Sequence, residues 1–136
     1  MQVALAALDA LGDPQYNQNI LPDETLRGLW PQGAVAAMSH LAAVQRVVPL
    51  GTVLAVELKV PEGAGGYASG AARAVATRMR RMGVYARPLG NVAYVMCTPT
   101  TSAGDAQWLM HQLEACLMDS GETEGHASPQ KQHATA

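Results

Sequence analysis

The sequence of 136 residues has no phenylalanine, two cysteines and two lysines, and charged residues make up only 15% of it. Two cysteines provide neither a disulfide framework nor a zinc pattern, so Cys97 and Cys116 are expected to be reduced core residues. A net charge of −2 gives no electrostatic footprint for a nucleic acid or an anionic membrane, and neither partner is expected. No apolar run approaches the roughly 20 residues that a membrane-spanning helix requires.

The scarcity of lysine limits the chemistry that the chain can carry. Lys131 lies in a polar C-terminal stretch, and Lys59 falls beside Pro61 on the mixed face of a predicted strand. Neither is a convincing Schiff-base lysine, because that role requires a dry pocket. The four histidines form neither a cluster nor a triad pattern, so no metal site is predicted.

Apolar periodicity, in contrast, runs through most of the chain. It predicts helices over residues 1–11, 72–82 and 106–117, the last preceded by Ser102 and Asp105 as a variant of the capping box. It also predicts a short helix capped by Asp23, and Pro31 either ends this helix or begins a second one that runs through Leu41. Branched residues predict two strands within residues 44–60 and two more at 84–86 and 91–97. The order predicts a small α/β fold, with a largely antiparallel sheet packed with helices. Residues 1–118 are expected to form one domain, and residues 119–136 a disordered tail.

One arginine lies in an unusual context. In the stretch VYARPLGNVAYVMC, Arg87 and Pro88 lie between two apolar segments that are predicted to pair as a hairpin. A guanidinium stays charged at any ordinary pH, so burying it is costly unless a carboxylate or phosphate meets it. The partner of Arg87 is either a nearby acid or an anionic ligand, and the residues by themselves leave both alternatives open.

Tyr94 lies on the second strand of the same stretch. Both alternating sets of side chains on this strand are mainly apolar, which predicts that the strand is covered on both faces. A covered tyrosine hydroxyl requires a polar partner. Tyr94 is therefore a candidate for the same site as Arg87, and the alternative is an ordinary core tyrosine with one backbone hydrogen bond.

The residues around Arg87 resemble a known family. The segment GVYARPLGNVAYVMCTPTTS closely resembles the C-terminal segment of diaminopelargonate aminotransferase, a fold-type I, class III pyridoxal-phosphate enzyme of biotin synthesis. Upstream, TLRGLW, AAVQRVVPLGTVLAVELK and GYASGAARA look like the eukaryotic form that is fused behind dethiobiotin synthetase. The resemblance extends from about residue 5 to about residue 118.

The resemblance implies a reaction and roles for two residues. The family transfers the amino group of S-adenosylmethionine to 7-keto-8-aminopelargonate, with pyridoxal 5'-phosphate as the cofactor of the complete, homodimeric enzyme. By resemblance, Arg87 holds the carboxylate of the keto acid and Tyr94 lines the substrate channel. The fused eukaryotic relatives imply a mitochondrial location, with any transit peptide upstream of Met1.

The resemblance covers only one part of such an enzyme. The large domain, which holds the Schiff-base lysine and most of the dimer interface in the family, has no counterpart in this sequence. The chain is therefore expected to be the small C-terminal domain alone, which contributes the carboxylate side of the active site and binds no pyridoxal phosphate by itself. The alternatives are a stand-alone small-molecule-binding or interaction module, or a structural piece that docks on a partner subunit through the apolar face of residues 1–11.

Overall fold

A computed structural model of the chain describes residues 1–17, 19–23, 25 and 27–119. The elements are α1 (Gln2–Gly12), α2 (Gln32–Ser39), β1 (Val44–Leu50), β2 (Val53–Leu58), α3 (Ala71–Arg81), β3 (Arg87–Leu89), β4 (Val92–Met96) and α4 (Ala103–Met118). The four strands form one sheet in the order β1-β2-β4-β3, and every neighbouring pair is antiparallel. The predicted α/β fold with an antiparallel sheet is confirmed. The predicted tail lies outside the described residues from Ser120 onwards.

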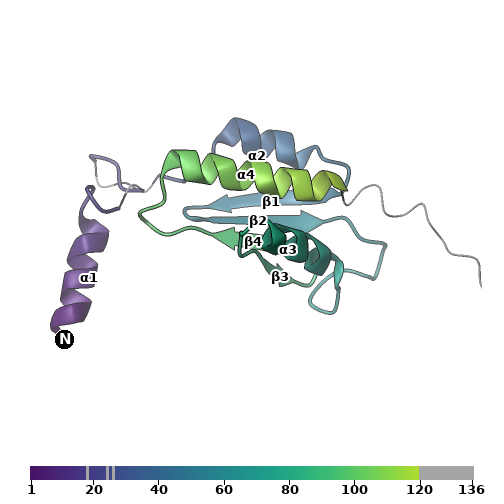
Figure 1. The fold of residues 1–136 in the computed structure, drawn as a ribbon, viewed down its shortest axis with the longest axis horizontal. Coiled ribbons are helices and arrows are strands. Elements are labelled where there is room, and N and C mark those ends of the chain that lie inside the picture. Colours follow the sequence, from purple (N-terminus) through teal and green to yellow (C-terminus); the bar gives the residue numbers. More distant parts are fainter. Residues whose placement is uncertain (18, 24, 26, 120–136) are drawn as a thin grey trace, which may run out of the picture.

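Helices α3 and α4 pack side by side on one face of the sheet (Figure 1). Alternate residues of β2 and β4 point into this layer, and Leu54, Val56 and Ala93 are completely buried there. Helix α3 presents Val75 and Met79, and α4 contributes its own buried stripe of Ala106, Met110, Leu113, Cys116 and Leu117. Because successive side chains of a strand point to opposite faces of the sheet, only every second side chain of β2 and β4 points toward these helices.

Helix α1 forms where the periodicity predicts it, but it buries none of its residues. Figure 1 shows it standing apart from the sheet and the other helices. Met1, Leu5, Leu8 and Leu11, which share one face of the helix, are all exposed. The helix is therefore separate from the core that holds the rest of the described chain together.

The short helix predicted from Asp23 is wrong for the described residues. The side chain of Asp23 accepts hydrogen bonds from the N–H and the hydroxyl of Thr25, which makes a local turn instead of a helix cap. Beyond it, the N–H of Leu29 donates to the carbonyl of Gly51 at 3.1 Å and ties this segment to the β1–β2 hairpin. The helix that does form, α2, begins after Pro31, as the second alternative predicts.

The hairpin around Arg87 also differs from its prediction. Residues 84–86 are not a strand; β3 instead consists of Arg87–Leu89, and the turn is made by Gly90 and Asn91. Gly90 has a φ of +63°, a left-handed conformation that glycine adopts without steric cost. A two-residue turn at this point lets Leu89 pair directly with Val92, so Arg87 joins the sheet rather than the turn.

Helix α4 begins with the cap that the sequence predicts. The hydroxyl oxygen of Ser102 accepts a hydrogen bond from the N–H of Asp105 at 3.1 Å, and the hydroxyl donates to the Asp105 carboxylate at 2.7 Å. Within the part of the chain that the structure describes, none of the helices combines the length and the hydrophobicity needed to cross a membrane.

Candidate functional site

The sheet face opposite α3 and α4, here named the open face, carries the residues that the helix layer does not use. Strand register arranges them in three rows that run across the sheet. Side chains directly opposite each other in adjacent strands point to the same face, with Cβ atoms about 4.5–5.5 Å apart. The rows are Arg46, Glu57, Val92 and Leu89; then Val48, Ala55, Tyr94 and Arg87; then Leu50, Val53 and Met96.

The middle row brings the two predicted site residues together. Arg87 on β3 is the direct register partner of Tyr94 on β4. Arg87 is exposed and Tyr94 is half-buried. The expectation that β4 is covered on both faces is wrong for the described residues, since Met96 is 62% exposed and lies on the same face as Tyr94. Among the described residues, only the face that carries Ala93 and Val95 is covered, because α3 and α4 pack there.

No acid neutralises Arg87 within the described residues. Its guanidinium makes no ion pair and no hydrogen bond there. The one acid of the open face is Glu57, whose carboxylate meets the guanidinium of Arg46 at 3.0 Å in the neighbouring row. The sequence leaves two kinds of partner open for Arg87, a nearby acid and an anionic ligand. The described residues supply no such acid.

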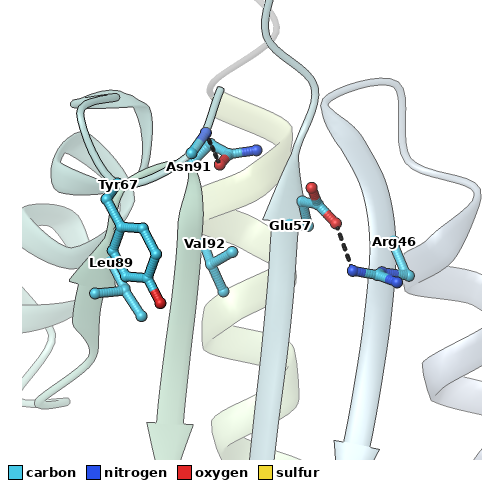
Figure 2. A pocket seen from close by; sticks show the side chains of 7 residues that line it. Arg46, Glu57, Tyr67, Leu89, Asn91 and Val92 are labelled. Atoms are coloured by element: carbon cyan, nitrogen blue, oxygen red, sulfur yellow. Dashed lines mark hydrogen bonds and ion pairs between the residues drawn. The ribbon is translucent and has the colours of Figure 1, made fainter. Parts of the chain in front are cut away.

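A shallow pocket of about 250 Å³ lies over the row of Arg46 and Glu57, next to the row of Arg87. Figure 2 shows Tyr67 and Leu89 on one side of this pocket and the ion pair of Glu57 with Arg46 on the other. Tyr67 comes from the loop between β2 and α3 and is 85% exposed. The pocket therefore combines an apolar wall with a polar rim.

Asn91 also lines this pocket, and the sequence reasoning missed it as a site residue. It is 6% exposed, and its amide joins the loop residue Gly66 to the carbonyl of Leu58 at the end of β2. The available signal was its place in the Arg-Pro-Leu-Gly-Asn turn, because an amide after such a glycine can bond backbone groups on both sides.

The remaining candidate groups do not gather into a second site. Lys59, the one lysine of the described residues, is exposed just beyond β2, which does not suit a Schiff-base lysine. Both cysteines are free thiols: Cys116 is buried in α4 and Cys97 is half-buried. Burial raises the pKa of both thiols, so both remain protonated at neutral pH. The described residues contain no group of three or more potential metal ligands.

The fold is that of a part of the known aminotransferases. An adenosylmethionine-8-amino-7-oxononanoate aminotransferase from Methanocaldococcus jannaschii matches 85% of this chain with a TM-score of 0.64 at 22% identity. A PMP-bound aminotransferase from Vibrio fluvialis matches 89% with a TM-score of 0.69 at 16% identity. The chain covers 26% of each of these two proteins, and identities this low establish the fold alone. No protein-family model matches the chain.

Sequence comparison finds relatives of higher identity. The chain is 42% identical over 111 residues to the mitochondrial bifunctional dethiobiotin synthetase/7,8-diamino-pelargonic acid aminotransferase of Arabidopsis thaliana. The aligned segment covers 81% of the chain. The protein of the same description from Oryza sativa is 44% identical over 101 residues. These bifunctional enzymes are homologues of the chain, and the family resemblance seen in the sequence is confirmed. The chain spans 13% and 12% of their lengths, respectively.

Proposed function

We propose that this chain forms the carboxylate-binding side of the active site in an adenosylmethionine-8-amino-7-oxononanoate transaminase of biotin biosynthesis. The observation that carries the proposal is the pairing of Arg87 with Tyr94 on the open face, where Arg87 has no acid partner among the described residues. The homology with the bifunctional enzymes supports the choice of reaction.

In this proposal Arg87 receives the carboxylate of 7-keto-8-aminopelargonate. A guanidinium matches a carboxylate in planar, bidentate fashion, and such charge-assisted hydrogen bonds are about twice as strong as neutral ones. Pro88 fixes its own φ and restricts Arg87 to an extended backbone, which limits the positions available to the guanidinium. Tyr94 stands beside Arg87 and offers an aromatic ring for the aliphatic part of the substrate and a hydroxyl for its polar groups.

The cofactor belongs to another part of the complete enzyme in this proposal. When bound, pyridoxal phosphate supplies the electron sink that transamination needs. The described residues do not fit it, because Lys59 is exposed and no buried lysine accompanies it. The function assigned to this chain is therefore to bind and orient the keto acid. The proposal takes the complete enzyme as a homodimer, from the family resemblance, and as mitochondrial, as the plant homologues are described.

The test uses a chimera of the Arabidopsis enzyme in which the matching 111-residue segment is replaced by that of this chain. Arg87→Ala is expected to raise the KM for the keto acid about 30-fold, the value of a lost charged hydrogen bond, and to change the KM for S-adenosylmethionine less than about threefold. The matched control is Arg46→Ala, which removes an arginine of the same face that is already paired with Glu57.

Three outcomes contradict the proposed function. One is an equal loss of affinity for both substrates in Arg87→Ala, because a carboxylate clamp specific to the keto acid cannot act on both. Another is a chimera that folds and binds pyridoxal phosphate but has no transaminase activity. The third is an effect of Arg46→Ala as large as that of Arg87→Ala, which would show that general charge, not the clamp, controls binding.

A further inference from the structure

Asn91 joins three separate segments at the turn that follows Arg87. Its side-chain oxygen Oδ1 accepts a hydrogen bond from the N–H of Gly66 at 3.0 Å, and its Nδ2 donates to the carbonyl of Leu58 at 3.1 Å. Its backbone carbonyl accepts from the N–H of Leu58 at 2.8 Å. One buried amide thus fixes both the end of β2 and the loop that carries Tyr67 to the Arg87 hairpin.

The neighbouring glycine strengthens this junction. A Cβ on Gly90 would overlap the carbonyl oxygen of Gly66, so the loop and the turn lie closer than any other residue would allow. The carbonyl of Gly90 accepts a hydrogen bond from the N–H of Ala72 at 3.2 Å in the first turn of α3. The turn is therefore held by β2, by the loop before α3 and by α3 itself.

The strand that carries Arg87 is short. It has three residues, all exposed, and lies at the edge of the sheet, where α3 packs beside it and β4 is the one strand of the described residues that pairs with it. Pro88, at its centre, has no N–H to donate. A binding side chain must be held to within about 0.5 Å to keep a productive geometry, so this short strand requires a firm anchor at its end.

We propose that Asn91 is a positioning residue for Arg87. By holding the turn against Leu58 and Gly66, it sets where the guanidinium stands on the open face beside Tyr94. The inference rests on the proposed function, since it concerns the same carboxylate site. Asn91 touches no substrate in this scheme and acts only through the strand.

The first test is Asn91→Ala in the chimera described above. Losing the amide leaves the N–H of Gly66 and the carbonyl of Leu58 without their partner, which loosens the anchor of β3. We expect the KM for the keto acid to rise about tenfold, while kcat and the KM for S-adenosylmethionine change less than about threefold. The matched control is Asn17→Ala. Asn17 is also buried, and its amide also bonds two backbone groups, but it lies in the loop after α1.

The second test is Asn91→Asp, which keeps the shape of the side chain. A protonated carboxyl accepts from Gly66 and donates to Leu58 as the amide does, whereas an ionised one has no proton for the Leu58 carbonyl. Burial and the negative charge of the nearby Glu57 favour the protonated form of the new carboxyl. The positive charges of Lys59 and of Arg46 oppose it, although Arg46 is paired with Glu57. We compare the KM for the keto acid of this variant with that of the unsubstituted chimera at the same pH. We expect the ratio of the two KM values to fall about tenfold from about pH 8 to about pH 5.5.

The outcomes separate this inference from the proposed function. Suppose that Arg87→Ala raises the KM for the keto acid selectively but the KM ratio of Asn91→Asp does not change with pH. This result overturns the positioning role of Asn91 and leaves the proposed function standing. If Asn91→Ala does not fold, the pH dependence of the KM ratio of Asn91→Asp tests the positioning role, with Asn17→Asp as the matched control. An equal rise of KM in the Asn17 and Asn91 variants would also overturn the inference, because a general loss of stability would then explain both.

Discussion

The two faces of the sheet are built from alternate residues of the same strands, yet they differ in almost every property. On the face toward α3 and α4, Leu54, Val56 and Ala93 are completely buried. On the open face, Leu50 and Met96 are 73% and 62% exposed. The covered face contributes burial of apolar area, which stabilises by about 25 cal/mol per Å². The open face contributes little of that kind.

Charge follows the same division. Arg46, Glu57 and Arg87 all lie on the open face, and the covered face of the sheet carries no charged residue among the described strands. Two of these charges neutralise each other, and the third is left for a ligand in the proposed function. If the proposed function holds, neighbouring residues of one strand serve stability and binding separately, and substitutions can separate the two properties.

The largest expected contrast between the faces comes from truncating leucine on each. Leu54→Ala creates a cavity in the completely buried layer and is expected to lower the free energy of unfolding by about 2–5 kcal/mol. Leu50→Ala, at an exposed position of the open face, is expected to change it by less than about 0.5 kcal/mol. Urea unfolding of the 136-residue chain measures both. Similar losses at the two positions would mean that the open face is packed against something in solution.

A smaller effect is expected where the loop meets the Arg87 turn. Gly90→Ala forces a left-handed alanine, and its Cβ overlaps the carbonyl oxygen of Gly66, so we expect a loss of about 2–3 kcal/mol in the free energy of unfolding. Gly63→Ala is the control, since Gly63 also has a positive φ, of +78°, but no atom lies within 4 Å of the added Cβ. It should cost only about 1 kcal/mol. Thermal unfolding of both variants gives the difference, and equal losses would rule out a close approach of the loop to the turn.

The smallest effect is expected for the ion pair of the open face. Glu57→Gln removes the partner of Arg46, and because the Arg46 side chain is 68% exposed, the loss should be only about 0.2–1 kcal/mol. High salt should reduce the difference from the unsubstituted chain. Glu62→Gln, at an exposed position with no ion pair among the described residues, is the control. A loss that salt leaves unchanged would indicate packing rather than charge at Glu57.

Local patterns predicted the elements well where one rule applies along the chain. The capping pair of Ser102 and Asp105, and the alternation of Leu54 and Val56, are properties of neighbouring residues, and both are present in the structure. Prediction was wrong where two local rules competed. Asp23 could cap a helix or bond Thr25, and Arg87–Leu89, predicted to connect two strands, form a strand themselves.

The coverage of β4 could not be predicted from its residues. Val92, Tyr94 and Met96 are as apolar as the buried set on the opposite face, so composition predicted two covered faces. Whether a second layer covers a sheet depends on segments elsewhere in the chain or in another chain. The described residues provide helices on one side only.

Which residues can share a face follows from the sequence alone, because alternation along a strand and the conformation of a glycine turn are local. The sequence also placed Arg87 and Tyr94 in one hairpin. The ion pair of Glu57 with Arg46, and the hydrogen bonds by which Asn91 joins the Arg87 turn to Leu58 and Gly66, depend instead on tertiary contacts. Those contacts link residues from 11 to 33 positions apart, and their register depends on how the whole sheet pairs and packs.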